Sequence, residues 1–374
     1  MIQPDPCSQQ GSGESSGEVF VAGGLNEDIK ARPFAAFTAR TSNPGRIYRA
    51  PGGVGRNIAH SLALLGSHSV LCSAAGQDSA GCSVIESTAA AGVDTSAVRV
   101  NPDYPTGAYL AIQDEHGDLA AAVSSMEIMD SLSPEQLAEF EPRLASASAL
   151  ILDTNLSSAA LAYLAGLARR YQVPCIAEPV SVEKTQRLSE ILEYCSWISP
   201  NSDELSALFS LDNLYIKNAI KSAAATPGRG CPVAADMSAA LNARLSAPAA
   251  PNILVTIGSQ GLLLLSRNPQ CDRLQSLVSA STAHPQASNQ NPSGSGAWLA
   301  WWYPPLETRV TDANGAGDAF LAGFTAAFTA EPAAGKTVAQ AISWGQAAAA
   351  ITLESQHTVA PGLSRDAIHR RLAE

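Results

Sequence analysis

The 374-residue chain lacks features that mark several classes of protein. Its seven cysteines include no Cys-x-x-Cys pair, which argues against a zinc site or a disulfide framework and indicates reduced thiols. No apolar run approaches the length of a membrane span, so we expect no membrane association. Lysine and arginine number 23 against 34 acidic residues, a formal net charge of −11, which argues against a nucleic acid polymer as partner.

Residues 1–17 contain acids, serine and glycine but no lysine or arginine, so they resemble neither a signal peptide nor a transit peptide. We expect a disordered leader in a cytoplasmic protein. The remaining residues, 18–374, are numerous enough for one large α/β domain or two smaller ones, and hydrophobic residues make up 46% of the chain.

Apolar stretches alternate with amphipathic stretches along most of the chain. "SVLCSAAG", for example, precedes "AGCSVIESTAAAG", and "ALILDTNL" precedes "SAALAYLAGLARRY". This order predicts an α/β fold with a doubly wound, mainly parallel sheet flanked by helices. "GAYLAIQDEHGDLAAAV" instead has two alternating runs around a turn at His116-Gly117-Asp118, which is typical of a hairpin. We therefore expect a separate small β layer.

Two stretches look inserted, namely residues 223–252 and 267–298. Both are rich in Ala, Pro, Ser, Asn and Gln, and the second shows little periodicity. We expect inserted loops, the second of them disordered.

The segment "TDANGAGDAFLAGF" places small residues and two acids at the start of a predicted helix. Glycines there let backbone N–H groups converge on an anion, and the helix dipole adds positive potential. Asp318, in the first helical turn, is placed to take a proton from a hydroxyl group. Capping of the helix by an acid is the structural alternative.

A second glycine segment, "APGGVGRNIA", precedes another predicted helix, whose end we place at Gly66. Gly52 and Gly53 allow close backbone approach, and Asn57 would project toward the same cleft. The segment does not match the dinucleotide-binding fingerprint, because Ile58 stands where glycine or alanine is needed. This mismatch argues against a nicotinamide oxidoreductase.

Three weaker signals lie at the ends of predicted strands. Asn26 and Asp28 flank a turn in "GGLNEDI". Asn201 and Glu204 in "PNSDE" suit either helix capping or a water-mediated magnesium site. "TIGSQG" suits a hairpin turn or a glycine turn over nucleotide phosphates; its candidate residues are Thr256, Gly258 and Gly261.

Taken together and in this order, the segments resemble the ribokinase-like, PfkB-type family of carbohydrate and nucleoside kinases. "GGVGRNIAHSLALLG" and "DANGAGDAFLAGF" look like the two signatures of that family, and "NSDE" is similar to its N-x-x-E motif. The resemblance covers residues 18–365 and implies an ATP-dependent phosphotransferase with an alcohol acceptor. It also implies a small β lid, from about 26–50 and 100–127, that often forms the dimer contact in relatives.

The resemblance implies a role for each candidate residue. Asp318 would be the base, with an anion hole formed by Gly315, Ala316 and Gly317. The substrate would be held by Asn26, Asp28, Gly52, Gly53 and Asn57, with Met126 packed on the nucleobase of a nucleoside. ATP would lie against Asn201, Thr256, Gly258, Gly261, Gly315 and Gly317. Glu204 would hold Mg2+ through water, and Asp312 would adjoin a monovalent cation such as K+. Ala313 and Asn314 depart from the family pattern beside that cation.

Within the family, "SNPGRIYRAPGGVGRN", "VSSMEIMD" and "EPVSVEK" look most like the branch that phosphorylates the 5′-hydroxyl of pseudouridine. A kinase of another nucleoside or of ribose is the alternative within the class. A catalytically silent sugar- or nucleotide-binding protein is the alternative outside it, although an intact Gly-Ala-Gly with Asp318 argues against silence.

Overall fold

The structure is a computed structural model that describes residues 17–245, 250–269, 271, 297–329 and 337–374. Within them, a large sheet has the order β11-β14-β13-β12-β10-β9-β8-β1-β4-β5. Its strands are β1 (Val19–Ala22), β4 (Ser69–Gly76), β5 (Val98–Asn101), β8 (Ala149–Asp153), β9 (Cys175–Glu178), β10 (Trp197–Ile198), β11 (Cys231–Pro232), β12 (Asn252–Thr256), β13 (Leu262–Ser266) and β14 (Leu299–Tyr303). All neighbours from β12 to β5 run parallel, whereas β13, β14 and β11 add antiparallel pairs at one edge. The expected doubly wound, mainly parallel sheet is confirmed.

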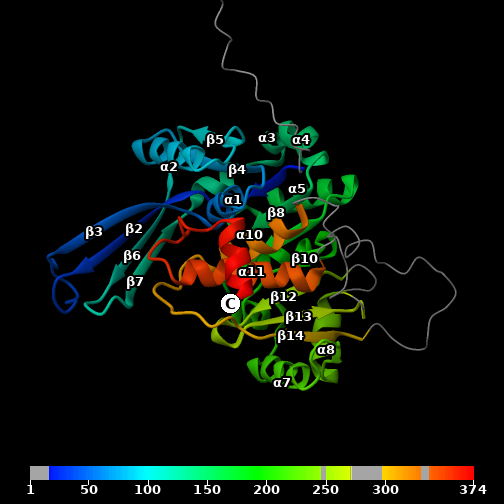
Figure 1. The fold of residues 1–374 in the computed structure, drawn as a ribbon. Coiled ribbons are helices and arrows are strands. Elements are labelled where there is room, and N and C mark those ends of the chain that lie inside the picture. The colour runs from blue at the N-terminus through cyan, green and yellow to red at the C-terminus, as the bar shows by residue number, and fades with distance from the viewer. Residues whose placement is uncertain (1–16, 246–249, 270, 272–296, 330–336) are drawn as a thin grey trace, which may run out of the picture.

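Helices cover both faces of the large sheet (Figure 1). The α-helices are α1 (Val54–Leu64), α2 (Ser79–Ala90), α3 (Pro134–Leu137), α4 (Glu141–Ala145), α5 (Ser158–Tyr171), α6 (Ser202–Phe209), α7 (Asn213–Ala224), α8 (Ala235–Arg244), α10 (Ala316–Thr329), α11 (Val338–Leu353) and α12 (Arg365–Ala373). Short 3-10 helices are η1 (Glu127–Ser131), η2 (Ala138–Phe140), η3 (Lys184–Glu190), η4 (Leu192–Tyr194) and η5 (Gly258–Gln260). Among the described residues, no helix has both the length and the apolar character needed to cross a bilayer.

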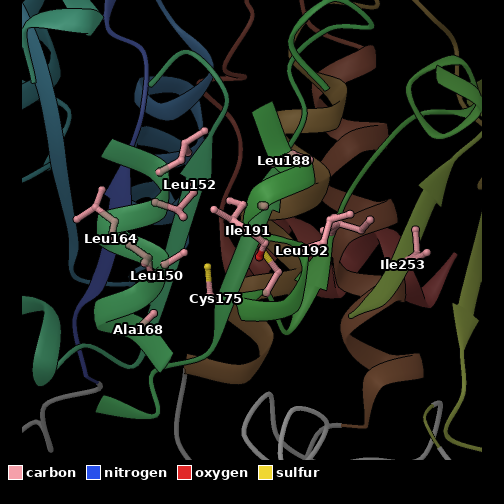
Figure 2. Packing of buried hydrophobic residues seen from close by; sticks show 14 of the residues in the cluster. Leu150, Leu152, Leu164, Ala168, Cys175, Leu188, Ile191, Leu192 and Ile253 are labelled. Carbon is pink, nitrogen blue, oxygen red and sulfur yellow. The ribbon is translucent and has the colours of Figure 1, made fainter. Parts of the chain in front are cut away.

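Alternate residues of the central strands supply two separate cores. Phe20 and Ala22 of β1 pack on the side that holds α5, and Val19 and Val21 pack on the side that holds α1, α10 and α11. This division follows from the two-residue period of a strand that is buried on both faces. Figure 2 shows part of the first core, in which Leu164 of α5 and Leu192 lie near the strand residues.

A second, four-stranded sheet protrudes from the body (Figure 1). Its order is β3-β2-β6-β7, formed by β2 (Asn26–Pro33), β3 (Gly45–Gly52), β6 (Gly107–Gln113) and β7 (Leu119–Ser125). The hairpin expected around Gly117 is the β6–β7 pair, and the separate small β layer is present. We call these four strands the β lid. Residues 98–101, by contrast, pair with β4 in the large sheet.

Helix α1 ends as the sequence predicts. Gly66 has φ 73°, and its N–H donates to the carbonyl of Ala63, while the N–H of Ser67 donates to that of Leu62. These two hydrogen bonds form the Schellman motif, in which glycine adopts the left-handed conformation at low cost. It stops the helix and sends the chain into β4.

The two expected inserts differ in what the structure describes. Residues 1–16 and most of 267–298 lie outside the described residues. Residues 223–245, expected to be part of a loop, instead include the end of α7, β11 and the whole of α8. Met237 and Leu241 of α8 are fully buried, one helical turn apart, which explains why this Ala-rich segment folds against the body.

The helix that carries Asp318, α10, packs closely against α11. A Cβ added to Gly345 of α11 would lie 2.7 Å from both the ring and the carbonyl oxygen of Phe320 on α10. Only a residue without a side chain permits this approach.

We therefore expect Gly345→Ala to destabilise the protein by about 1–3 kcal/mol, the usual cost of overpacking. Gly166→Ala is a matched control, since Gly166 lies inside α5 with no atom within 4 Å of an added Cβ. Alanine there should be neutral or raise stability by roughly 0.5–1 kcal/mol. Urea unfolding of both variants measures the difference, and equal stabilities would show that α10 and α11 are not tightly packed.

Candidate active site

Acidic and polar residues, among them the predicted site residues Asn201 and Thr256, gather at the carboxyl-terminal ends of the parallel strands. β8 and β9 end at Asp153 and Glu178, and β12 ends at Thr256, while Asn201 follows β10. In open α/β sheets this edge is where ligands bind.

Asp318 and Asn57 are adjacent although 261 positions separate them in sequence. Nδ2 of Asn57, on α1, donates to Oδ2 of Asp318, on α10, over 2.9 Å. Desolvation raises the pKa of Asp318 to about 7, and the charges of Asp153 and Asp28 add to the rise, while the Asn57 hydrogen bond opposes it. A carboxyl group of this pKa changes its protonation state near neutral pH, as a general base should.

On the lid side of the site, Asn26 and Asp28 form a pair. Nδ2 of Asn26 donates to Oδ1 of Asp28 over 2.7 Å. Desolvation raises the pKa of Asp28, against the hydrogen bond from Asn26 and the charges of Lys30 and Arg56. The pair begins β2 and therefore lies where the lid leaves the body.

Gly52 and Gly53 are required by the packing of the chain on itself. A Cβ on Gly52 would lie 2.2 Å from Oδ1 of Asp28, and one on Gly53, which has φ 102°, would lie 2.3 Å from the carbonyl oxygen of Gly24. The sequence predicted the close approach correctly, but the approaching groups are a carboxylate and a backbone carbonyl of the same chain.

Met126 lies beside these residues. Its Sδ would be 2.8 Å from a Cβ added to Gly107, and its Cε would be 3.2 Å from one added to Gly24. Cβ of Asn26 also adjoins Gly107, at 3.2 Å from the same added atom. Met126 therefore joins the Asn26 side of the site.

Arg56 is a buried residue that the sequence analysis did not single out. Its Nη1 donates to Oδ1 of Asn57 over 3.3 Å, and its Nε donates to Oγ1 of Thr88 over 3.3 Å. Desolvation lowers the pKa of Arg56 to about 10, against the charge of Asp28. Because Arg56 occupies the oxygen of the Asn57 amide, the amide nitrogen faces Asp318. The feature of the sequence that could have revealed Arg56 is a charged residue next to Asn57 at the start of a predicted helix.

The Gly-Ala-Gly segment forms the beginning of α10. Gly315 has φ 79°, and an added Cβ would lie 2.0 Å from the carbonyl oxygen of Thr358, so any side chain is excluded there. Gly317, by contrast, has no atom within 4 Å of an added Cβ. The backbone of Ala316 and Gly317 faces a cavity instead of protein.

That cavity has a volume of about 700 Å3. Its lining includes five predicted nucleotide residues from separate segments, Asn201, Thr256, Gly258, Gly261 and Gly317, together with Ala316 of the predicted anion hole. Gly315, also predicted to adjoin ATP, is not among the lining residues. Apolar side chains, including those of Leu306, Phe320 and Leu353, complete the wall. An apolar cavity with a few polar groups at one end is the usual form of a small-molecule site.

Asn201 and Glu204 form a capping box at the start of α6. Oδ1 of Asn201 accepts from the N–H groups of Asp203 and Glu204, and a carboxylate oxygen of Glu204 accepts from the N–H of Asn201. Desolvation raises the pKa of Glu204, against its hydrogen bonds with Asn201. In the part of the chain that the structure describes, no three His, Cys, Asp or Glu side chains cluster as metal ligands would.

Asp312 bonds to two groups. Its Oδ1 accepts from the backbone N–H and the side-chain Nδ2 of Asn314, over 2.9 and 2.7 Å. Nζ of Lys30, on lid strand β2, lies 3.6 Å from its Oδ2. The lid and the loop before α10 are therefore joined by an ion pair, which the sequence analysis missed.

Two further acids, the fully buried Asp153 and the partly buried Glu178, were also missed. Asp153 ends β8 and accepts hydrogen bonds from Gly24 and Gly55, and Glu178 ends the neighbouring β9. Desolvation raises the pKa of Glu178 well above its ordinary value, and the charges of Glu204 and Asp318 act in the same direction. An acid that ends an apolar strand was the signal in "ALILD".

Comparisons with known proteins agree with this geometry. The family model described as pfkB family carbohydrate kinase matches residues 19–276 and 300–364. A pseudouridine kinase of Arabidopsis thaliana is 30% identical over 371 residues, which covers 94% of each chain. A pseudouridine kinase of Escherichia coli is 27% identical and covers 92% of this chain and 93% of its own.

Solved structures show the same fold. A carbohydrate kinase from Agrobacterium tumefaciens aligns with a TM-score of 0.70 and 24% identity over 96% of this chain and 97% of its own. A ribokinase of Arabidopsis thaliana complexed with ribose and ATP aligns with a TM-score of 0.72 and 18% identity over 96% of this chain and 99% of its own.

The family match covers most of the chain, and the residues of both family signatures, Asn57 and Asp318, are in contact in the structure. This chain belongs to the pfkB family of carbohydrate kinases and is a phosphotransferase with an alcohol group as acceptor.

Proposed function

We propose that the protein transfers the γ-phosphoryl group of ATP to the ribose 5′-hydroxyl of pseudouridine. The observation that carries the proposal is the contact of Asp318 with Asn57, between the Asn26–Asp28 pair on one side and the 700 Å3 cavity on the other. A nucleoside held at Asn26, Asp28 and Asn57 would present its hydroxyl to Asp318. The two relatives named above, both pseudouridine kinases, support this choice of nucleoside.

In this proposal ATP occupies the cavity, with its adenosine against the apolar wall and its phosphates toward Gly315 and Gly317. Backbone N–H groups at the start of α10 would stabilise the charge that develops on the transferred group. Asp318 would accept the proton of the attacking hydroxyl. A ribokinase of the same fold was solved with ribose and ATP, which supports ATP as the donor.

We further propose that Mg2+ accompanies ATP. Magnesium retains several waters and binds through one or two carboxylates together with substrate phosphates. Glu204 fits a role through water, since its Oε2 accepts from the Asn201 N–H and the cavity is lined by the neighbouring residues Asn201 and Asp203. When bound, the ion would neutralise phosphate charge; this chain would hold it through water.

For Asp312 we propose a supporting role beside a monovalent cation such as K+. Such an ion would share the carboxylate with Lys30, whose ammonium group is 3.6 Å away. Five of the described cysteines, Cys72, Cys82, Cys175, Cys195 and Cys231, are free thiols, which supports a reducing compartment such as the cytoplasm. Fractionation of cells that express the tagged chain tests that location, and recovery outside the cytoplasm would contradict it.

Asp318→Asn removes the proposed base while it preserves the shape of the side chain. Turnover should fall by roughly 10²–10⁴, with nucleoside affinity largely retained. In the wild type, kcat/KM should rise as pH increases through about 7, because Asp318 must be ionised. Initial rates from pH 5 to 9 and nucleoside titrations provide the measurement, and wild-type turnover in the variant would exclude Asp318 as base.

The pH dependence of stability in the wild type and in Asp318→Asn gives an independent control. The raised pKa means that folded Asp318 binds a proton more tightly than unfolded Asp318. Its contribution to stability is therefore greatest below pH 4 and is lost as pH rises to about 7. Asp318→Asn lacks this loss, so its melting temperature relative to the wild type should be higher at pH 8 than at pH 5.

A panel of nucleosides and sugars with Mg-ATP tests the substrate. Pseudouridine differs from uridine by an N1–H donor, and a buried acceptor left unpaired by uridine costs ~1–3 kcal/mol. We expect kcat/KM to favour pseudouridine by roughly tenfold to a few hundredfold. ADP release, measured with and without EDTA, is the readout. A preference for ribose or another nucleoside would leave the kinase assignment intact and overturn the substrate.

The outer face of the β lid supports a homodimer. Ile29 faces away from Asp28 because side chains alternate along β2, and Leu110 and Val123 share its face through the strand register. Val123 is 64% exposed, and Ile47, on the same face, is 66% exposed. We propose that a second copy of the chain covers this apolar face.

Val123→Lys should convert a dimer to a monomer, because a charge would be buried at the contact. Leu214→Lys is the matched control: Leu214 is 58% exposed on α7, far from the lid in sequence. Sedimentation equilibrium of the three proteins gives their masses. A wild-type monomer, or a dimer that survives Val123→Lys and dissociates with Leu214→Lys, would contradict the proposed contact.

A further inference from the structure

Asp153 is a fully buried carboxylate at the end of β8. Its Oδ2 accepts from the N–H of Gly24 over 2.8 Å and from the N–H of Gly55 over 2.7 Å. Its Oδ1 accepts from the N–H of Asn155 over 2.8 Å. One side chain therefore joins three segments that lie far apart in sequence.

Two of those segments carry the nucleoside side of the site. Gly24 belongs to the turn between β1 and β2, and Gly55 lies in the first turn of α1. The segments also touch directly, since the N–H of Arg56 donates to the carbonyl of Gly24 over 3.0 Å. A Cβ on Gly23 would lie 2.3 Å from Oδ2 of Asp153, so the turn is pressed against the carboxylate.

Desolvation raises the pKa of the Asp153 carboxyl group, and the hydrogen bonds from Gly24, Asn155 and Gly55 oppose that rise by favouring its ionised form. All three partners are N–H groups, which a carboxylate satisfies and a protonated acid would satisfy less well. The N-terminus of α1 adds favourable potential because Gly55 lies in its first turn. A buried apolar residue would avoid the desolvation of a charge but would leave three donors unpaired, each at a cost of ~1–3 kcal/mol.

Each clamped segment leads directly to a site residue. Asn26, two positions after Gly24, pairs with Asp28; Asn57, two positions after Gly55, bonds to Asp318. We propose that Asp153 is a positioning residue for phosphoryl transfer, which fixes β2 and its Asn26–Asp28 pair relative to Asn57 and Asp318. This inference rests on the proposed function in taking Asp318 as the base.

Asp153 also belongs to the charged surroundings of Asp318. The groups that face Asp318 are Asn57 from α1, Asp28 from β2, Asp153 from β8 and Glu178 from β9. Asp153 and Asp28 both raise the pKa of Asp318, so loss of the Asp153 charge should lower it. Nζ of Lys184 donates to Oδ1 of Asn155, and the charge of Asp153 acts to raise the pKa of Lys184 against desolvation, so Lys184 is a cation in the surroundings of Asp153.

The test is Asp153→Asn in the full chain. The amide has one acceptor oxygen in place of two, so it cannot satisfy Gly24, Gly55 and Asn155 together. We expect kcat/KM for the nucleoside to fall roughly tenfold to a hundredfold, the usual effect of a small misplacement. KM for ATP should be unchanged, because the cavity is built from other segments. The acid limb of the pH profile should move below the wild-type position near pH 7.

Asp94→Asn is the matched control. The Asp94 carboxylate also accepts a hydrogen bond from a backbone N–H, that of Ser96 over 2.8 Å, and it contacts Arg143. The backbone of Asp94, however, pairs with Val70 at the amino end of β4, away from the site. The variant should lose stability without change in KM or in the acid limb. If Asp153→Asn loses activity only in proportion to its folded fraction, with the wild-type KM and acid limb, Asp153 is structural only and the proposal fails.

Gly55→Ala separates geometry from charge. An added Cβ would lie 2.8 Å from the carbonyl carbon of Gly23, so the segments should part while Asp153 keeps its charge. The KM for the nucleoside should rise, while the acid limb of the pH–rate profile should stay at its wild-type position. If Asp153→Asn does not fold, this variant tests whether the contact between the segments positions the site. A Gly55→Ala variant with wild-type kinetics would overturn the proposal.

Two readouts need no turnover. Hydrogen exchange at the Gly24 and Gly55 amides should accelerate in Asp153→Asn, and carboxyl NMR should show Asp318 titrating at lower pH. If both change while the wild type phosphorylates none of the substrates, the proposed function fails and the positioning of Asp318 stands. If neither changes, Asp153 does not position the site.

Discussion

Backbone-to-backbone contact between the turn after β1 and the first turn of α1 is the constraint on which the site depends. Gly23 and Gly24 on one side meet Gly53 and Gly55 on the other at distances that no Cβ would permit. The glycines that resemble a ligand-binding loop are thus first a requirement of the fold. They bring the lid strand β2 to the helix that carries Asn57.

The second organising feature is the concentration of acid at the sheet edge. Asp28, Asp153, Glu178, Glu204 and Asp318 surround the site of a chain whose formal net charge is −11. Such a negative field opposes the binding of an anionic ligand. Backbone N–H groups at the start of α10 and the ammonium group of Lys30 supply positive potential that offsets it locally. It also explains why the pKa values of these acids are raised: each is desolvated, and most lie near another negative charge.

Much of the fold and site could be predicted from the sequence because the signals were local. Helix α1, its end at Gly66 and the hairpin at Gly117 follow from periodicity and turn chemistry within short windows. The residues that were missed act over long separations: Asp153 bonds to groups 129 and 98 positions away, so nothing beside it in sequence reveals its partners. Arg56 was missed for a related reason, since its burial depends on Thr88 of another helix. Helix α8 was missed because two buried residues in an Ala-rich segment give only a weak period.

The length of β2 has a mechanical consequence. The strand begins at the glycine contact and runs outward for eight residues, pairing on both sides only with other lid strands. At 3.2–3.4 Å per residue it is a lever of about 26 Å, so a rotation of about 5° at its base would move its tip by about 2 Å. Asn26, the first residue of β2, lies at the base of this lever, where the same rotation produces almost no displacement. A rotation of the lid at its base would therefore leave Asn26 in register with Asp318, and the ion pair between Lys30 and Asp312 is a contact that such a rotation would have to break.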